Sequence, residues 1–327
     1  MNTYESLLTQ IAQTYQNSRV KVFQVANQEL LATYWEIGQY IVEFEQKGQE
    51  KAQYGSELLK KLAQDLQLLG RGFSRSNLAN MRLLYLRFPK IQTASGQLSW
   101  SHYVELLKIE HDLERNFYEK QCLNENWSVR ELKRQKDTAL FLRLASGKNP
   151  EQILALAQKG QEIQKAEDIL KEPYIFEFFK IPEPYHVSEK QLETALIDNL
   201  QAFLLELGKG FAFLGRQYRI TINNEHFYVD LVFYHHILKC FVLIDLKVNE
   251  IKHYDIGQMN MYLGYFAKER NSEGDHEPIG IILSREKDEF LVEYATYGMQ
   301  SQLWVARYQL YLPTANELKA LMQKLDV

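Results

Sequence analysis

FYVDLVFYH, residues 227–235, and CFVLIDLKV, residues 240–248, are the two stretches that decide the fold of this chain. Each is an apolar run rich in β-branched and aromatic residues, which is typical of a strand. The short segment between them predicts a turn near residues 237–238 and an antiparallel hairpin. Asp230 and Asp245 are equally far from that turn, so this register places the two carboxylates opposite each other.

Two like charges placed opposite each other destabilise a sheet, and a bound metal ion is the usual reason for such a pair. Lys247 follows Asp245 by two residues and therefore points to the same face. Mg²⁺ takes one or two carboxylates from a protein and keeps several waters, whereas structural zinc prefers nitrogen and sulfur ligands. The pattern favours Mg²⁺, with Mn²⁺ as the substitute. The alternative interpretation is a structural Asp–Lys pair at the strand ends.

The elements expected around the hairpin follow the order helix, three strands, helix, strand. Glu193 lies in the second turn of the first helix, where it could be a further metal ligand. Gln258 lies early in the second helix and could hold a water or Lys247 by hydrogen bonds. The expected elements are a helix from the capping box Ser188–Gln191 to Leu207, strand Phe211–Ile222, the hairpin, helix Tyr254–Lys268, strands Ile279–Leu283 and Leu303–Tyr311, and helix Asn316–Leu325.

Residues 1–145 predict helices throughout, beginning with an apolar stripe that includes Leu7, Leu8, Ile11 and Tyr15. Farther along, a helix over 54–69, a Gly-Arg-Gly turn and a helix over 75–87 have the layout of a DNA-binding helix-turn-helix. The alternative is a plain helical bundle whose arginines face solvent.

A change of character between residues 151 and 186 indicates a connecting segment, in which we expect a helix over Glu151–Leu170. The predicted domains are therefore a helical one over 1–150 and an α/β one over 187–327, an α+β chain with a mixed central sheet. Residues 1–150 carry 20 Lys/Arg and 16 Asp/Glu, and residues 151–327 carry 18 and 26. A basic half joined to an acidic half suits a phosphate-facing module next to a carboxylate site.

Composition narrows the class of protein further. A chain of 327 residues with 46% hydrophobic and 24% charged residues is typical of soluble globular proteins. No apolar stretch reaches the length of a membrane span, and the N-terminus lacks the pattern of a secretory signal. Two cysteines, Cys122 and Cys240, favour a reducing compartment, so we expect a cytoplasmic protein without membrane association.

With these residues in place, the chain resembles the YhcG-like family of PD-(D/E)xK nucleases. An acid on the second strand and a (D/E)-x-K triplet on the third are the features of the superfamily. The stretches that carry the closer resemblance are WEIGQYI (35–41), YGSELL (54–59), GRGFSRSNLANMR (70–82), LSWSHY (98–103), WSVREL (127–132), GFAFLGRQY (210–218), FYVDLVFYH (227–235) and IGQMNMYL (256–263). Together they cover nearly the whole chain.

The resemblance implies a role for each site residue. Asp230 and Asp245 are expected to bind the metal, and Lys247 is expected to be the catalytic lysine. Gln258 resembles the glutamine of the family's helix, and Glu193 resembles the acid of its first helix, with both a metal-binding and a catalytic role. The triplet begins here with Asp245, where we expect the family to carry Glu, and the shorter side chain bears on the metal geometry.

The resemblance also implies a Mg²⁺-dependent DNA endonuclease, a hydrolase of phosphodiester bonds in DNA restriction, defence or repair and recombination. Its N-terminal domain is expected to be winged-helix-like and to bind DNA or mediate self-association. Arg71, Arg75, Arg82 and Arg216 are the expected nucleic-acid contacts. DNA and a second copy of the chain, forming a dimer, are the expected partners, and an association with a restriction or defence system stays open. The alternative is a catalytically silent nucleic-acid-binding or assembly protein on a nuclease scaffold.

Overall fold

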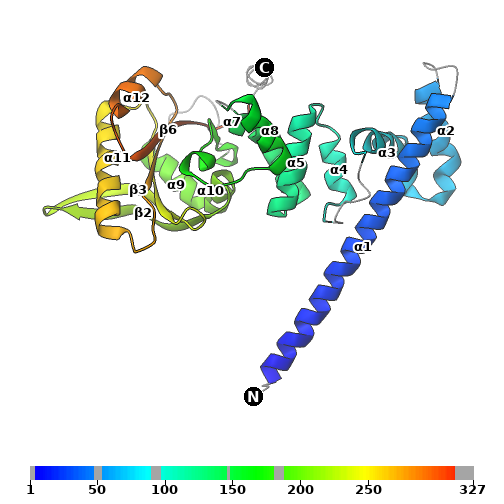
Figure 1. Cartoon of the computed structure of the whole chain (residues 1–327), viewed down its shortest axis with the longest axis horizontal. Coiled ribbons are helices and arrows are strands. Elements are labelled where there is room, and N and C mark those ends of the chain that lie inside the picture. The colour runs from blue at the N-terminus through cyan, green and yellow to red at the C-terminus, as the bar shows by residue number, and fades with distance from the viewer. Residues whose placement is uncertain (1–3, 48–53, 90–96, 146–147, 180–187, 314–327) are drawn as a thin grey trace. The chain divides into compact units, whose positions relative to one another are not determined.

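The computed structural model describes residues 4–47, 54–89, 97–145, 148–179 and 188–313. The chain divides into two compact units. Unit 1 comprises residues 1–136 with 157–160, and unit 2 comprises residues 137–156 with 161–327. Figure 1 labels helices and strands of each unit.

Unit 1 is built from helices. They are α1 Tyr4–Lys47, α2 Tyr54–Asp65, α3 Arg75–Arg87, α4 Trp100–Leu106, α5 Asp112–Glu125 and α6 Val129–Asp137, with the 3₁₀ turns η1 Leu66–Leu69 and η2 Arg71–Phe73 between α2 and α3. The predicted helix over 75–87 is confirmed to the residue. Ser74 caps it by accepting a hydrogen bond from Asn77 N–H at 3.2 Å. The described residues between 4 and 145 contain no strand, so the wing of a winged helix stays a prediction.

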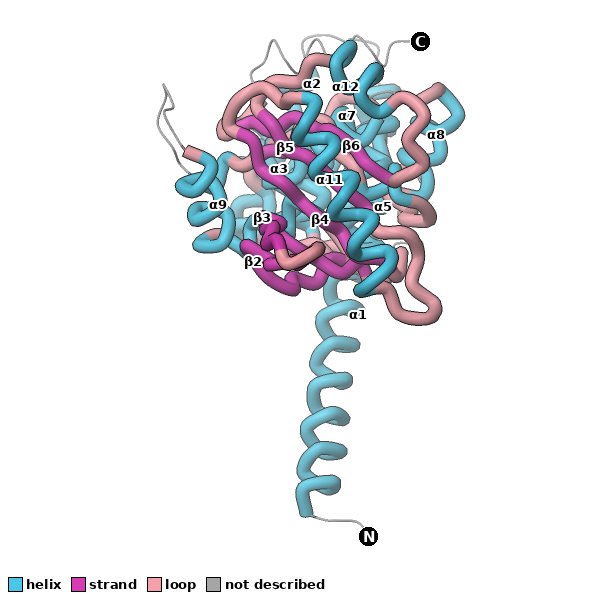
Figure 2. The backbone as a smooth tube through the Cα atoms, turned by 90° about the vertical axis from the view of Figure 1, so that its left-hand side faces the viewer, coloured by secondary structure: helices cyan, strands magenta, loops and turns pink. Residues whose placement is uncertain are grey.

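The second half of α1 packs closely on α3. Ile41, Leu78 and Met81 form a buried cluster between these helices. Gly38 permits the close approach, because a Cβ atom there would lie 2.1 Å from the carbonyl oxygen of Met81. The first half of α1 extends away from α2 and α3, as Figures 1 and 2 both show.

The helix expected over Glu151–Leu170 is wrong in its second half. The helix α8 covers only Pro150–Lys159, and Gly160 follows with φ of +79°. A glycine in this left-handed conformation ends a helix, because residues with a Cβ rarely adopt it. Residues 166–169 then form only a 3₁₀ turn, η4.

Unit 2 is a six-stranded mixed sheet covered by helices. The spatial order is β1-β6-β5-β4-β3-β2, in which β1, β6, β5 and β4 are parallel and the β4-β3-β2 side is antiparallel. The strands are β1 Tyr174–Ile175, β2 Phe211–Ile222, β3 Glu225–His235, β4 Cys240–Lys247, β5 Ile279–Ser284 and β6 Gln302–Gln309. The helices are α7 Leu140–Ala145, α8, α9 Glu189–Asp198, α10 Leu200–Leu207, α11 His253–Tyr265 and α12 Glu289–Thr296, with the 3₁₀ turns η4 and η5 Glu177–Phe179, and with η6 Phe266–Arg270 as a π turn.

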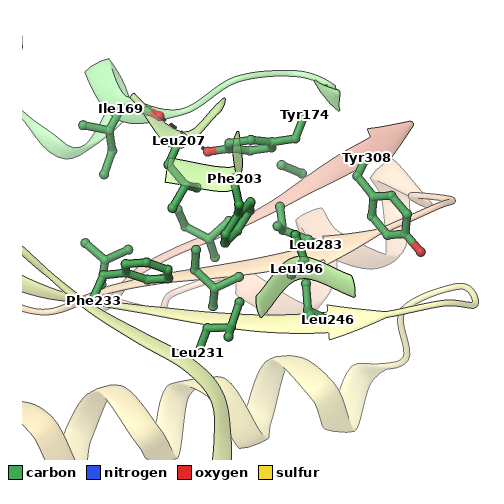
Figure 3. Close-up of a cluster of buried hydrophobic side chains, with 14 of the residues drawn as sticks. Ile169, Tyr174, Leu196, Phe203, Leu207, Leu231, Phe233, Leu246, Leu283 and Tyr308 are labelled. Atoms are coloured by element: carbon green, nitrogen blue, oxygen red, sulfur yellow. Dashed lines mark hydrogen bonds between the residues drawn. The ribbon is translucent and has the colours of Figure 1, made fainter. Parts of the chain in front are cut away.

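The sheet buries apolar side chains on both faces. One face packs on α9 and α10 through a cluster that includes Leu196, Phe203, Phe233 and Leu246 (Figure 3). The other packs on α11 and α12. Burial on both sides explains why the central strands β4 and β5 read as continuous apolar runs, whereas the edge strand β2 is largely exposed.

The predicted order of helix, three strands, helix and strand is confirmed, and so is the α+β fold class. The predicted helix from 188 to 207 is interrupted at Asn199, which separates α9 from α10. Ser188 and Gln191 form the predicted capping box. The helix predicted over 316–325 lies outside the described residues.

Unit 2 also contains a buried ion pair at its start. Arg143 and Glu206 have fully buried side chains, and Arg143 Nη1 lies 2.6 Å from Glu206 Oε1. Arg143 also donates to the carbonyl oxygens of Thr138 and Pro173, both at 2.9 Å. Ile175 N–H donates to Glu206 at 3.0 Å. The pair therefore joins the residues before α7 to α10 and to the first strand.

In the ranges that the structure covers, even the 44-residue α1 falls short of the apolar character that a bilayer-spanning helix requires.

Candidate active site

The β3–β4 hairpin has the register that the sequence predicted. His235 pairs with Cys240 and Leu231 pairs with Ile244, so the next position along brings Asp230 against Asp245. Their carboxyl groups lie within hydrogen-bonding reach of each other. Asp230 Oδ2 also accepts a hydrogen bond from Leu246 N–H at 2.8 Å.

Burial raises the pKa of both aspartates. For Asp245, which is 5% exposed, the negative charge of Asp230 adds to that effect. For Asp230, the hydrogen bond from Leu246 opposes it. Two carboxylates in contact, one buried and one half-buried, stay ionised together more readily when positive charge is nearby, so this pair favours a bound cation.

Lys247 supplies part of that charge. Its Nζ lies 2.9 Å from Asp245 Oδ2 and 3.5 Å from Asp255 Oδ1, an acid in the first turn of α11. Burial acts to lower the pKa of Lys247, but the two carboxylates outweigh it and hold the pKa above its ordinary value. Lys247 is therefore a protonated hydrogen-bond donor in this arrangement. The expectation that it shares a face with Asp245 is confirmed.

Gln217 connects the pair to Glu193. Its side-chain amide donates to Glu193 Oε2 and to Asp230 Oδ1, each at 2.9 Å. Its backbone has φ of +44°, a left-handed conformation that is uncommon for a non-glycine residue and often marks a functional site. Sequence reasoning gave Gln217 no part in holding the acids together.

Gln258 reaches the site through a tyrosine. Its amide donates to the hydroxyl of Tyr262 at 2.5 Å, and that hydroxyl donates to the carbonyl oxygen of Tyr228 at 3.1 Å. Burial raises the pKa of Tyr262, and the charge of Asp245 raises it further. Sequence reasoning missed Tyr262 and Asp255. Tyr262 follows Gln258 by four residues, a spacing that places both on one helix face and could have identified it.

The donor set suits a hard divalent cation. Asp230 and Asp245 offer only oxygen atoms, and one or two carboxylates are enough for Mg²⁺, which keeps several waters. Glu193 is connected to Asp230 through the side-chain amide of Gln217, which donates a hydrogen bond to both. Over the described ranges, no three acidic, histidine or cysteine side chains converge as a complete set of metal ligands. The pair is thus the part of the site that fits the ion, and Glu193 as a ligand stays a prediction.

The arginines expected to contact nucleic acid lie in different surroundings. In unit 1, Arg75 is exposed at the start of α3, whereas Arg82 forms an ion pair with Glu45 at 2.7 Å. In unit 2, Arg216 is exposed on β2, next to Gln217. The side chain of Arg71 lies outside the described residues.

Solved structures similar to part of the chain include a repair endonuclease from Pyrococcus abyssi and EndoMS in its apo form. The first is 17% identical with a TM-score of 0.28, over 40% of this chain and 50% of that chain. The second is 15% identical with a TM-score of 0.25, over 40% of this chain and 48% of that chain.

Sequence comparisons cover both halves of the chain. A family described as "YhcG PDDEXK nuclease domain" matches residues 167–326, and one described as "DUF1016 N-terminal domain" matches residues 10–143. A protein of Escherichia coli (strain K12) named "Putative nuclease YhcG" is 35% identical over 348 residues, which span 96% of this chain and 92% of that protein. The resemblance seen in the sequence motifs is thereby confirmed, and the chain belongs to the YhcG family of proteins with a PD-(D/E)xK nuclease domain.

Proposed function

We propose that this protein is a Mg²⁺-dependent endonuclease that hydrolyses phosphodiester bonds of DNA, with its reaction centre at Asp230, Asp245 and Lys247. The observation that carries the proposal is the contact between half-buried Asp230 and buried Asp245 on neighbouring strands, with the Lys247 ammonium 2.9 Å from Asp245. A purely structural ion pair would need only one aspartate beside Lys247. A bound cation accounts for the second acid, Asp230, in contact with Asp245.

In this proposal Asp230 and Asp245 hold the ion, and Glu193 adds a third carboxylate from α9. When bound, the ion supplies positive charge that polarises the scissile phosphodiester and offsets the charge that develops during hydrolysis. Lys247 donates its hydrogen bonds to the phosphate or to the attacking water. Asp245 and, to a lesser extent, Asp255 keep Lys247 protonated and hold its ammonium beside the pair.

Two further groups position the site. Gln217 keeps Glu193 and Asp230 facing each other through its two hydrogen bonds. Gln258 fixes the hydroxyl of Tyr262, which is anchored on the backbone of β3 beside Asp230. Both act through neighbouring side chains, so their loss reduces the rate less than the loss of Lys247.

Exposed basic residues support DNA as the substrate. In unit 1, Arg75 lines a surface hollow of about 620 Å³ together with Lys60 and Ser74, at the N-terminus of α3. Lysine, arginine and a helix N-terminus are groups that bind phosphate. In unit 2, Arg216 is placed two residues before Tyr218 on the strand that carries Gln217. We propose Arg75 and Arg216 as phosphate contacts, and Arg71 and Arg82 as further ones, with Arg82 leaving Glu45 on binding.

The test is cleavage of supercoiled, linear and branched DNA by the purified protein with Mg²⁺ or Mn²⁺. We expect cleavage by the parent and losses of about 100-fold or more for Asp230→Ala and Lys247→Ala, the range seen when a charge-stabilising group is removed. Lys268→Ala changes an exposed lysine of η6 and should leave the rate unchanged. The proposal fails if no DNA is cut with either ion, or if Asp230→Ala and Lys247→Ala cut as fast as the parent. DNA binding that survives both substitutions without any cleavage would instead identify a silent nuclease scaffold.

A further inference from the structure

The first half of α1 carries large apolar side chains that no residue in the described ranges covers. Between Tyr4 and Leu30 every large apolar residue is at least 40% exposed. From Leu31 onward the same helix is anchored in unit 1, with Leu31, Ile41 and Val42 at 1–5% exposure. Figure 2 shows this first half as a single free-standing helix. An isolated helix with apolar residues in water is marginal, because most helical stability comes from packing of its apolar face.

The exposed residues repeat at the spacing of a coiled coil. Positions 4, 8, 11, 15, 18, 22, 25 and 29 form a stripe along the helix in which steps of four and three residues alternate. The stripe is apolar except at Ser18 and at its last position, Glu29. This average of 3.5 residues is the period at which two helices keep their apolar seams together. The six apolar members are exposed by 55–78% and are Tyr4, Leu8, Ile11, Tyr15, Val22 and Val25.

The size of the stripe matches a stable interface. Residues 4–29 extend over about 40 Å at 1.5 Å per residue. Six large side chains and the groups beside them offer on the order of 800 Å² along that length, which is what one partner contributes to a standard protein interface.

The charges on this part of α1 disfavour DNA and a membrane surface as the occupant of the stripe. Between residues 4 and 30 the charged side chains are Glu5, Arg19, Lys21 and Glu29, which sum to zero. A surface for DNA would be basic, because phosphate contacts supply most of the affinity. A helix that lies on a membrane would be rich in Lys and Arg on its polar face, whereas this face carries mainly Gln, Thr, Asn and Ser. A neutral, apolar seam is compatible with an identical seam.

We propose that residues 4–29 of α1 form an antiparallel coiled coil with the same residues of a second copy of this chain. In this pairing residue numbers that face each other sum to 33. Leu8 then packs on Val25 of the second copy and Ile11 on its Val22. Tyr15 meets Ser18 of the second copy at the centre, so a large side chain fills the space left by a small one. Lys21 and Arg19 face neutral residues.

The parallel arrangement is less favourable for three reasons. Ser18 would face Ser18 and leave a gap in the seam. Tyr15 would face Tyr15 beside that gap. Glu29 would face Glu29, and two like charges at a core position repel each other. The antiparallel arrangement removes all three, which is why the proposal specifies direction as well as partner.

The first experiment measures the mass of the full chain in solution by sedimentation equilibrium. We expect the parent to be a dimer at micromolar concentration. Ile11→Glu and Val22→Glu should each give a monomer, because the two positions form one layer and each substitution buries an unpaired charge. Gln13→Glu is the control, since Gln13 is exposed on the opposite side of the helix, and it should remain a dimer. Circular dichroism checks that every variant keeps its helices.

The second experiment determines direction by cross-linking. Leu8→Cys and Val25→Cys are made in separate chains, and the native Cys122 and Cys240 are buried. On oxidation, a mixture of the two variants should cross-link, and each variant alone should cross-link at least about tenfold less. Strong cross-linking within each single variant would overturn the antiparallel pairing.

A monomeric parent, or dimers of Ile11→Glu and Val22→Glu as stable as the parent, would overturn the proposal. If a monomeric parent binds DNA or anionic lipid vesicles and these two variants do not, the stripe binds that other partner instead of a second copy. The inference is independent of the proposed nuclease activity, since neither experiment measures cleavage.

Discussion

Replacement of Arg143 by methionine is expected to be among the most destabilising single changes in unit 2. Arg143 and Glu206 are fully buried, and their 2.6 Å contact is accompanied by the hydrogen bonds of Arg143 to Thr138 and Pro173. Methionine keeps most of the volume and removes the charge. Glu206 would then be a buried carboxylate that has lost the Arg143 guanidinium, while Ile175 N–H still donates to its side chain and Lys171 still donates to its backbone carbonyl.

The magnitude follows from the loss of one partner. Breaking a buried pair in this way costs about 3–5 kcal/mol, because the remaining carboxylate stays out of water and loses the positive charge of Arg143. A domain is typically stable by about 5–15 kcal/mol, so the change removes a large share of the free energy of unfolding. With a urea slope of about 2–3 kcal/mol per molar, the midpoint of unit 2 should fall by about 1.5 M.

The assay is urea unfolding followed by circular dichroism, on the parent, Arg143→Met, Glu206→Leu and the double variant. The double variant is the decisive one, since replacing both charges by apolar groups is close to neutral. It should recover about 2 kcal/mol or more relative to the single variants. The same pair bears on the domain boundary. A chain that begins at residue 137 keeps Arg143, whereas one that begins at the predicted boundary near 150 loses it and should be less stable by a similar amount.

A cost below about 1 kcal/mol for Arg143→Met would refute the reasoning, because it would mean that Glu206 is readily solvated or protonated. Equal stability of the chains beginning at 137 and 150 would refute the assignment of residues 137–145 to unit 2. Residues 138–145 are all buried, so a null result there would be hard to reconcile with the packing.

Three further perturbations test other parts of the fold and site. Gly38→Ala should destabilise unit 1 by about 1–3 kcal/mol in thermal unfolding, because the added Cβ would overlap the Met81 carbonyl. Gly264→Ala in α11 is the control: its Cβ would have no neighbour within 4 Å, so the change should be neutral or stabilising. Burial lowers the pKa of His235 below 6.5, so proton binding favours the unfolded chain and the free energy of unfolding should fall as the pH drops through 6.5 toward the folded pKa, by at most about 1.4 kcal/mol per pH unit. His235→Gln should make this pH dependence less steep, whereas His226→Gln, a change at an exposed histidine, should leave it as in the parent. In the absence of divalent ions, Gln217→Ala should lower the free energy of unfolding by about 1 kcal/mol, because Glu193 and Asp230 lose a shared hydrogen-bond donor. The rise in melting temperature on adding Mg²⁺ should be larger in this variant than in the parent, and an equal rise in both would count against Gln217 as the bridge.

The sequence predicted the hairpin and its carboxylate pair because both depend on local patterns. The apolar runs define the strands, and the distance of each acid from a short turn defines the register. Helix starts were equally predictable where a cap residue is explicit, as at Ser74 and Ser188. The buried core of unit 2 follows from the same apolar runs.

The parts that escaped prediction depend on contacts between distant residues. Nothing in the sequence around Gln217 indicates a left-handed backbone inside a strand, so its bridge between two acids was not visible. Asp255 reaches Lys247 only because the crossover brings α11 back over β4. The pairing of Arg143 with Glu206 was not visible either, because Arg143 ends a helical region in the sequence but pairs with a residue 63 positions later.

The turn at residues 236–239 has a consequence for how chains of this family can vary in length. Because the two acids belong to one hairpin, their facing depends on the number of residues in that turn, although the turn lies at the far end of the strands from them. A single added residue there would move one aspartate to the opposite face of the sheet. Insertions are therefore expected to accumulate in loops such as 271–278, and the turn should keep its length among relatives that retain Asp230 and Asp245.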